Sequence, residues 1–127
     1  MNTPDNITEL GPNEIFVFGS NLSGRHGKGA ARTAHKMFGA IYGQAYGLQG
    51  KSFAIPTVDA KIKDKLPIEA IDTYVSAFIA FAVNHPALTF YVTEIGCGLA
   101  GHKVEDIAPL FKYAQNVENI ILPLRFR

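Results

Sequence analysis

The sequence predicts a three-layer α/β/α domain in which a mixed, largely parallel β-sheet lies between helices on both faces. Two observations predict this fold class. Short apolar runs alternate along the chain with helix-periodic stretches in the order β-α-β-α-β-α-β, and the connections between them are short. No linker, repeat or low-complexity segment interrupts this order, and 127 residues suffice to bury one hydrophobic core. We therefore expect a single domain over residues 1–127.

The first half of the chain predicts two strands and one helix. Residues 14–18 (EIFVF) predict a buried strand that ends at Gly19. A helix is expected from about Gly29 to Phe38, with Gly39 as its C-terminal stop. Residues 52–55 (SFAI) predict a second strand that ends at Pro56, and the glycine-rich stretch 39–50 receives no element. The apolar face expected for the helix consists of Ala30, Ala31, Ala34, Met37 and Phe38.

The second half predicts two helices and two strands. The clearest helix runs from Pro67 to about Asn84, because its apolar residues recur with a period of 3.6. Residues 88–93 (LTFYVT) predict a strand. A third helix is expected to start near Glu105, because Pro109 is tolerated only in the first turn. Residues 119–124 (NIILPL) predict the last strand.

Charge and glycine content are unevenly distributed. The net charge is only +1, which argues against binding to extended nucleic acid. Between Glu14 and Asp59 there is no acidic residue, yet this stretch holds five Lys or Arg residues and eight of the 12 glycines. Flexible backbone and positive charge therefore coincide, as they would in a small anion site. A solvated basic surface with glycines in turns is the alternative.

Several classes of protein do not fit the composition. Cys97 is the only cysteine, so no internal disulfide forms, and no Cys/His or carboxylate cluster has the spacing of a metal site. The N-terminus lacks the pattern of a secretory signal, and no apolar run is long enough to span a bilayer. We expect a cytoplasmic protein with no metal, no cofactor and no membrane partner.

Two glycine-rich loops follow predicted strands and lead into predicted helices. The first glycine loop is residues 19–29, and the second is residues 96–101. In a parallel sheet both loops lie at the carboxyl ends of the strands, where ligands bind, and a helix N-terminus attracts phosphate. Neither a Walker nor a dinucleotide-binding pattern is present, since no Ser or Thr follows Lys28 and the glycine spacing differs. The two loops predict a site for a pyrophosphate-sized ligand.

Four segments resemble the macro domain, a family that binds ADP-ribose and related compounds. DNITEL resembles its opening G-D-I-T segment, and FGSNLSGRHGKGAA resembles its N-A-A-N-x-x-L-x-x-G-G-G-V loop. AYGLQGKSFAIPTV resembles the G-Y-x-L-x-x-K-x-x-I-H-T-V segment, and EIGCGLAGHKVEDIA resembles the A-I-G-T-G-x-x-G-Y-P segment. Order and spacing agree from about Asp5 to Phe111. The chain is short for this family, so the sheet is expected to lack peripheral strands.

The resemblance implies roles for particular residues. Asn21 would contact the distal ribose, both loops would wrap the phosphates, and His26 matches a histidine of phosphatase members; these two are the candidate catalytic residues. Four positions depart from the family: Asn6 replaces the adenine-binding aspartate, Lys28 interrupts a triple glycine, Cys97 replaces Ser or Thr, and His102 replaces an aromatic. The implied ligand-binding residues are Asn6, Ile7, Gly19, Ser20, Asn21, Gly27, Lys28, Gly29, Ala30, Gly96, Cys97, Gly98, Leu99, Ala100, Gly101 and His102.

Each candidate also has a structural alternative. Asn21 is a common turn residue, His26 is an isolated loop histidine, and Cys97 would need an activating base, for which only His102 is nearby in the sequence. Glu94 at a strand end is a candidate to act as an acid or to orient a water, and its alternative is a solvated residue at the end of the strand. Two functions therefore stay open: hydrolysis of a phosphate, acyl or ADP-ribosyl group from the distal ribose, and binding of a nucleotide or nucleic-acid end without turnover.

Overall fold

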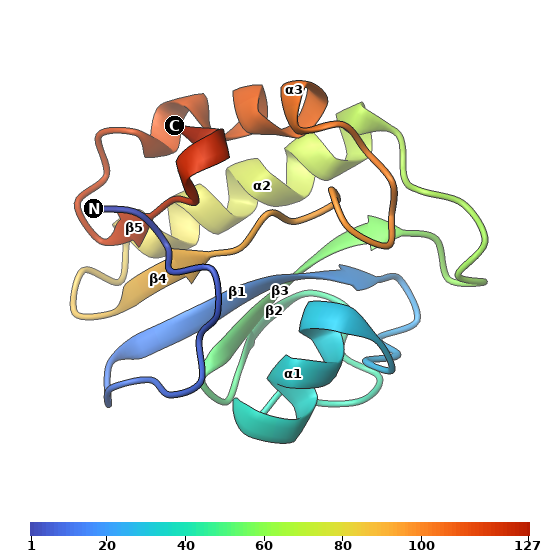
Figure 1. Ribbon diagram of the computed structural model, residues 1–127, viewed down its shortest axis with the longest axis horizontal. Coiled ribbons are helices and arrows are strands. Elements are labelled where there is room, and N and C mark those ends of the chain that lie inside the picture. Colours follow the sequence, from blue (N-terminus) through green and yellow to red (C-terminus); the bar gives the residue numbers. More distant parts are fainter.

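The computed structural model, which describes residues 1–127, consists of a five-stranded sheet between two layers of helices (Figure 1). The strand order is β2-β3-β1-β4-β5; β1, β3, β4 and β5 are parallel to one another, whereas β2 pairs antiparallel with β3. The predicted α/β class with a mostly parallel sheet is thus confirmed. The strands are β1 (Glu14–Asn21), β2 (Gly47–Gln49), β3 (Ser52–Val58), β4 (Thr89–Val92) and β5 (Ile120–Ile121).

Helices cover both faces of the sheet. α1 (Gly29–Met37) lies on one face, and α2 (Ile68–Val83) and α3 (Val104–Ile107) lie on the other with the 3₁₀ helix η1 (Ala108–Ala114), as Figure 1 shows. A last 3₁₀ turn, η2 (Leu124–Phe126), brings the C-terminus close to the N-terminus. No helix of the chain is both long enough and apolar enough to cross a membrane.

Each face of the sheet buries its own hydrophobic core. The larger core lies under α2 and η1 and includes Phe53, Phe78, Phe90 and Phe111. The smaller core lies under α1, where small side chains let the helix pack closely on the sheet. It consists of Phe16, Phe18, Ala31, Ala34, Phe38, Ala40 and Ala54.

Two strands run further than the sequence predicts. β1 continues through Gly19 to Asn21 because its last residues pair with β3. β3 continues through Pro56 to Val58. A proline is tolerated here because β2 pairs only with the residues from Ser52 to Ala54. No strand beside Pro56 therefore needs a hydrogen bond from the N–H that proline lacks. The predicted ends at Gly19 and Pro56 are therefore wrong, and both strands extend into the site described below.

The helices match the predictions in position but differ in detail. α2 follows its predicted span closely. In α1 the buried face is formed by Ala31 and Ala34 with Phe38 just beyond the helix, while Ala30 and Met37 are exposed, which corrects the predicted face. Gly39 has a φ of +78° and ends α1 as expected.

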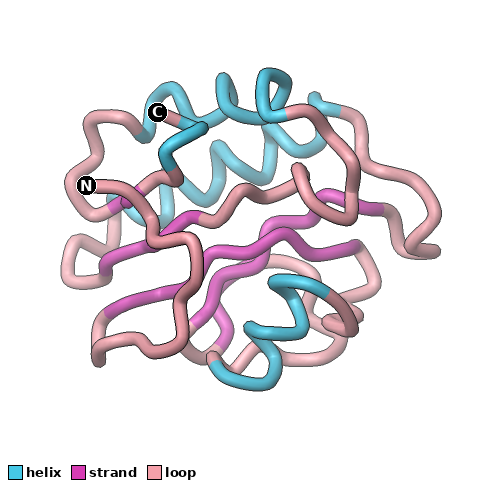
Figure 2. The backbone as a smooth tube through the Cα atoms, in the orientation of Figure 1, coloured by secondary structure: helices cyan, strands magenta, loops and turns pink.

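The C-terminal third contains less regular structure than the sequence predicts. α3 has only four residues and passes directly into η1, whose first turn holds Pro109 (Figure 2). The last strand covers Ile120 and Ile121 alone, because the chain turns into η2 after Pro123.

The short strand β2 was not predicted, since its three residues lie in the glycine-rich stretch.

Candidate functional site

A cavity of about 850 Å³ opens at the edge of the sheet where β1, β3 and β4 end. This is the edge at which parallel sheets bind ligands, and the volume suits a small organic molecule. Both glycine loops border the cavity. It is lined by Gly19, Ser20, Asn21, Arg25, Gly27, Lys28, Gly29, Ala30, Ala31, Tyr42, Thr57, Val58, Ile62, Thr93, Glu94, Ile95, Gly96, Gly98, Leu99 and Ala100.

The two glycine loops approach each other at two points. At the floor, a Cβ placed on Gly19 would lie 3.4 Å from the backbone nitrogen of Gly96. At the mouth, a Cβ placed on Gly29 would lie 3.3 Å from Cδ1 of Leu99. The Leu99 side chain, which is 76% exposed, therefore lies against the start of α1. The structure brings together the two loops that the sequence could only assign to one edge.

The side chain of Asn21 shapes the first glycine loop. Its Oδ1 accepts hydrogen bonds from the backbone N–H of Arg25 at 3.0 Å and from the hydroxyl of Ser23 at 2.7 Å. Its Nδ2 donates to the Arg25 carbonyl oxygen at 2.7 Å. Asn21 is 8% exposed, so these bonds satisfy a nearly buried amide. Asn21 thus acts as a turn residue, which was the structural alternative to ligand contact. Only one hydrogen of its side-chain amide is left to bind a ligand.

Gly24 allows the first loop to fold back on the chain that follows α1. It has a φ of +70°, and a Cβ at this position would lie 2.5 Å from the carbonyl carbon of Gly43. Its carbonyl oxygen accepts a hydrogen bond from the Gly43 N–H at 3.0 Å. Only glycine can combine this backbone conformation with so close an approach.

His26 lies beneath the first loop and does not line the cavity. It is 1% exposed, and its ring packs edge-on against Phe18 and beside His35 and Tyr42. Nε2 donates to the Ile41 carbonyl oxygen at 2.9 Å, and Nδ1 is buried without a hydrogen-bond partner. The structure therefore gives His26 a place in the packing under the loop, not the cavity position expected of a general base.

The N-terminus of α1 opens directly into the cavity. Gly29, Ala30 and Ala31 form its first turn, where backbone N–H groups have no partner within the helix. No side chain caps this end, and the first turn holds no acidic residue. Lys28 stands at the N-cap position, and Arg25 also lines the cavity. Free N–H groups, the helix dipole and two cations together suit a bound anion.

The second glycine loop contributes backbone but no helix terminus. Gly96, Gly98, Leu99 and Ala100 line the cavity, whereas the first turn of α3 does not. Of the remaining predicted residues, Gly101 is exposed and lies outside the lining. The expectation that both loops lead into phosphate-binding helices is therefore met only by the first.

Cys97 and His102 anchor the second loop to the protein. Cys97 packs against the larger core, and burial raises the pKa of its thiol, so the sulfur is protonated at neutral pH. His102 is 8% exposed and its Nε2 bonds the Leu66 carbonyl oxygen at 2.9 Å. Neither side chain lines the cavity. His102 thus does not cover a ligand from this position, and Cys97 is no activated nucleophile.

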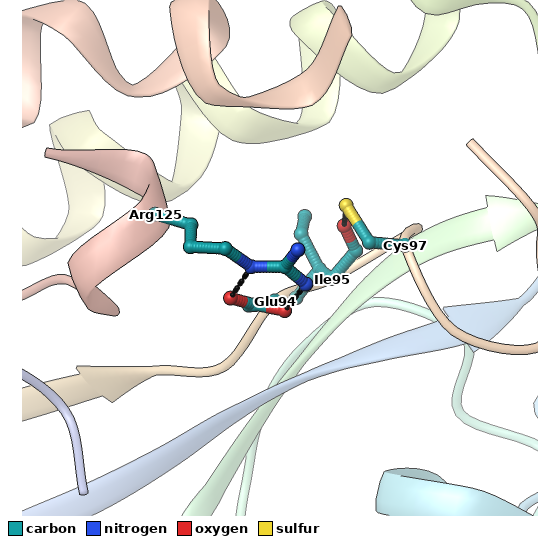
Figure 3. A network of polar contacts seen from close by, with 4 residues as sticks. All are labelled: Glu94, Ile95, Cys97 and Arg125. Atoms are coloured by element: carbon teal, nitrogen blue, oxygen red, sulfur yellow. Dashed lines mark hydrogen bonds and ion pairs between the residues drawn. The ribbon is translucent and has the colours of Figure 1, made fainter. Parts of the chain in front are cut away.

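Glu94 contributes the only carboxylate in the cavity lining, and Arg125 of η2 holds it. Nε and Nη2 of Arg125 donate to the two carboxylate oxygens at 2.8 Å and 2.5 Å, as Figure 3 shows. These hydrogen bonds lower the pKa of Glu94, so it is ionised at neutral pH. An ionised Glu94 can accept hydrogen bonds but cannot act as a proton donor.

A second cavity of about 440 Å³ adjoins the first. Both cavities are lined by Thr93 and Glu94, so Glu94 stands at their junction. Asp5 lines the second cavity, whereas its neighbours Asn6 and Ile7, predicted as ligand contacts, line neither. Ile7 packs against the smaller core. Besides these shared residues, the second cavity is lined by Thr3, Pro4, Asp5, Pro123, Leu124 and Arg125.

The sequence prediction missed the wall that β3 provides. Thr57 and Val58 line the cavity because β3 extends past Pro56 to the same edge as β1, and Ile62, in the loop after β3, lines it as well. Applying the strand-end rule to this strand would have found Thr57 and Val58. Ile62 has a φ of +58°, the only positive value at a residue other than glycine, which is a strained conformation for a β-branched side chain. Tyr42, in the chain that follows α1, also belongs to the lining.

No group of three or more His, Cys, Asp or Glu residues is placed to hold a metal ion. The polar groups of the main cavity are backbone amides, hydroxyls, the Asn21 side-chain amide, the Arg25 and Lys28 cations and the paired carboxylate of Glu94. Such a set can bind an anionic organic molecule through its charge and its hydroxyl groups.

Comparisons with known proteins found a similar fold but no protein of known function. No family model matches the chain, and no curated protein matches it. The chain is similar to a solved structure described as a protein of unknown function from Bacteroides thetaiotaomicron, with a TM-score of 0.56 and 20% sequence identity. The match covers 90% of this chain and 88% of the other. At this identity the similarity supports a shared fold alone.

Proposed function

We propose that this protein binds ADP-ribose or a related nucleotide diphosphate, with the diphosphate between the two glycine loops. One observation carries the proposal: the open N-terminus of α1 and the backbone of the second loop face the same cavity. A second cavity shares Thr93 and Glu94 with it as lining residues, so the two cavities lie side by side at Glu94. A ligand with a charged centre and groups on both sides suits two adjoining cavities better than a single phosphate does.

The diphosphate is expected to lie closest to α1. The unpaired N–H groups of Gly29–Ala31 can donate to phosphate oxygens without a change in the helix. Lys28 and Arg25 form no ion pair with any carboxylate of the protein, so their charge is available to the ligand. Hydrogen bonds between charged groups and phosphate are about twice as strong as neutral ones.

The second cavity is proposed to hold the base. Asp5 lines it, although the resemblance to macro domains had pointed to Asn6 as the residue that reads adenine. A carboxylate oxygen of Asp5 can accept a hydrogen bond from the exocyclic amine of adenine. ADP-ribose should therefore bind more tightly than its inosine analogue, which lacks this amine, and Asp5→Asn should reduce the difference more than Asn6→Ala does.

Binding without turnover is the form of the proposal that the residues support. His26 lies outside the cavity, the Asn21 amide is engaged within its own loop, and Glu94 is held ionised by Arg125. Hydroxyls in the lining donate to backbone oxygens: Thr57 to Ser20, and Thr93 to Val17. These groups can position a ribose, but they do not supply a free acid–base pair.

Calorimetric titrations with ADP-ribose, its 1″-phosphate, NAD and AMP test the proposal. We expect binding of ADP-ribose, weaker binding of AMP, and no phosphate released from the 1″-phosphate above background. If wild-type protein releases phosphate and His26→Ala releases it at the same rate, the protein is an enzyme whose reaction does not need His26. Absence of binding by every one of these compounds would contradict the proposed ligand class, and a nucleic-acid terminus would then be the next anion to test.

A further inference from the structure

Glu94 occupies a position that the proposed binding role does not yet use. The two cavities share two lining residues, Thr93 and Glu94, and only Glu94 has an ionisable side chain. It lies just beyond β4, and Arg125, which also lines the second cavity, donates to both of its carboxylate oxygens (Figure 3). A molecule that extends from one cavity into the other must pass this carboxylate.

The chemical order of a nucleotide decides which part of the ligand meets Glu94. A nucleotide diphosphate is linked in the order base, ribose and diphosphate. With the diphosphate at the start of α1 and the base in the second cavity, the ribose that joins them lies at the junction. The groups that this ribose presents are its 2′- and 3′-hydroxyls, which are hydrogen-bond donors.

We propose that Glu94 accepts hydrogen bonds from the 2′- and 3′-hydroxyls of the base-linked ribose, so that the protein selects ribonucleotides with a free diol. Because this inference rests on the proposed function, it names the ligand class more narrowly: derivatives whose adenosine ribose carries neither a 2′-phosphate nor a 2′-deoxy position. An acidic side chain that holds a ribose diol is an established means of selecting NAD-type over NADP-type nucleotides in other folds.

The Glu94 carboxylate has the capacity for this role. Two carboxylate oxygens offer about four acceptor positions, and Arg125 uses two of them, one on each oxygen. The remaining positions can accept two hydroxyl hydrogens. The low pKa of Glu94 keeps the group an acceptor at neutral pH. Arg125 is then a positioning residue, since it holds the carboxylate in one orientation without contacting the diol.

A 2′-phosphate would bring a second anion to this junction. Its repulsion by Glu94 and the loss of the 2′-hydroxyl donor both oppose binding. A 2′-deoxy ligand loses only the hydrogen bond and brings no charge. Arg125, whose side chain is 63% exposed, is the only cation that lines the second cavity, and it would have to leave Glu94 to pair with the 2′-phosphate.

Titration calorimetry with three ligands tests the inference: ADP-ribose and its analogues with a 2′-deoxy or a 2′-phosphate adenosine ribose. Wild-type protein should bind ADP-ribose about tenfold or more tightly than either analogue, in line with the loss of a hydrogen bond to a charged group. In Glu94→Gln the preference over the 2′-phosphate should fall most, since the repelling charge is gone. Arg125→Met should weaken ADP-ribose binding less than Glu94→Gln does.

Glu105→Gln is the matched control, because Glu105 is an exposed glutamate that pairs with Lys103 and lines neither cavity. It should leave all three affinities unchanged. Equal wild-type affinities for the three ligands, or a preference that survives in Glu94→Gln, would overturn the role of Glu94 while leaving the proposed function intact. If none of the three ligands binds wild-type protein, the proposed function fails and this inference fails with it.

Discussion

The two glycine loops that face each other across the cavity are built in different ways. The first is held by its own polar side chains: the Asn21 amide makes three hydrogen bonds within the loop, and Gly24 packs against Gly43. The second is fixed mainly at its ends, through Gly96 and His102. Between those ends, a Cβ on Gly98 or Gly101 would meet no atom within 4 Å.

This difference separates two tasks in binding. A loop whose polar groups are already satisfied presents its N–H groups in one arrangement, so it pays little ordering entropy when an anion arrives. A loop with free space around its glycines can adjust to the ligand and cover it. We therefore expect the first loop to set the affinity for the charged part of the ligand and the second to set how long the ligand stays.

The largest expected effect is on stability and distinguishes a constrained glycine from a free one. Gly24→Ala requires a left-handed conformation and forces a Cβ to within 2.5 Å of the Gly43 carbonyl carbon. It should lower the free energy of unfolding by about 2–5 kcal/mol. Gly98→Ala has neither problem and should change it by less than about 0.5 kcal/mol. Urea denaturation of both variants measures this contrast; equal losses would mean that the loops are equally constrained.

The next effect separates the shape of the first loop from its charge. Asn21→Ala removes the acceptor of the Arg25 N–H and the donor to the Arg25 carbonyl oxygen, and it should destabilise the protein by about 1–3 kcal/mol. Asn21→Asp keeps both bonds that Oδ1 accepts, but it sets a carboxylate oxygen against the Arg25 carbonyl oxygen in place of the Nδ2 donor, so it should cost a similar amount of stability. It places a negative charge in the anion site, however, and should weaken ADP-ribose binding by about tenfold or more. If Asn21→Asp binds ADP-ribose as wild type does, the anion does not lie at this loop.

A smaller effect is expected from the cation at the start of α1. Lys28→Ala should weaken ADP-ribose binding by about two- to tenfold and reduce its dependence on salt, because one exposed charge–phosphate contact is lost. Lys112→Ala removes an exposed lysine that lies in η1, away from the cavity, and is the matched control. Calorimetry at two salt concentrations checks both variants. A larger loss in Lys112→Ala would place the electrostatic site elsewhere.

The smallest effect concerns the second loop. Leu99→Ala removes an exposed side chain that touches Gly29 across the mouth. It should leave stability unchanged and raise the dissociation rate of ADP-ribose by about two- to fivefold, since little apolar area is lost from the covered ligand. Stopped-flow displacement measures this rate. An unchanged dissociation rate would mean that the Leu99 side chain of the second loop does not help to retain the ligand.

Local sequence patterns predicted most of the fold. Helix α2 and the parallel strands followed from apolar periodicity and from proline and glycine signals, because these residues act within a few positions of the chain. The ends of β1 and β3 were wrong because they depend on strand pairing: Gly19 stays in the strand beside β3, and Pro56 is tolerated where β2 has already ended. Strand β2 was missed for the same reason, since its three residues are ordered only by pairing with β3.

The candidate site was predicted in outline but not in the direction of its side chains. Glycines at strand ends correctly indicated two loops at one edge. Spacing along the chain could not reveal that His26 turns under the loop toward Phe18, or that His102 turns toward Leu66. Arg125 reaches Glu94 from the far end of the chain, 31 residues away, and no local pattern encodes that contact. Tertiary packing decides these orientations.

The backbone amide spectrum of the protein tests the central claim most directly, because the proposed ligand is held chiefly by N–H groups. In a ¹H–¹⁵N titration with ADP-ribose, the amides of residues 27–31 and 96–100 should shift most, with smaller shifts at Thr3 and Asp5 of the second cavity. The amides of η1, Ala108–Ala114, should stay in place. Saturable shifts that centre on η1, or no shifts at either glycine loop at millimolar ADP-ribose, would contradict a nucleotide diphosphate bound between the loops.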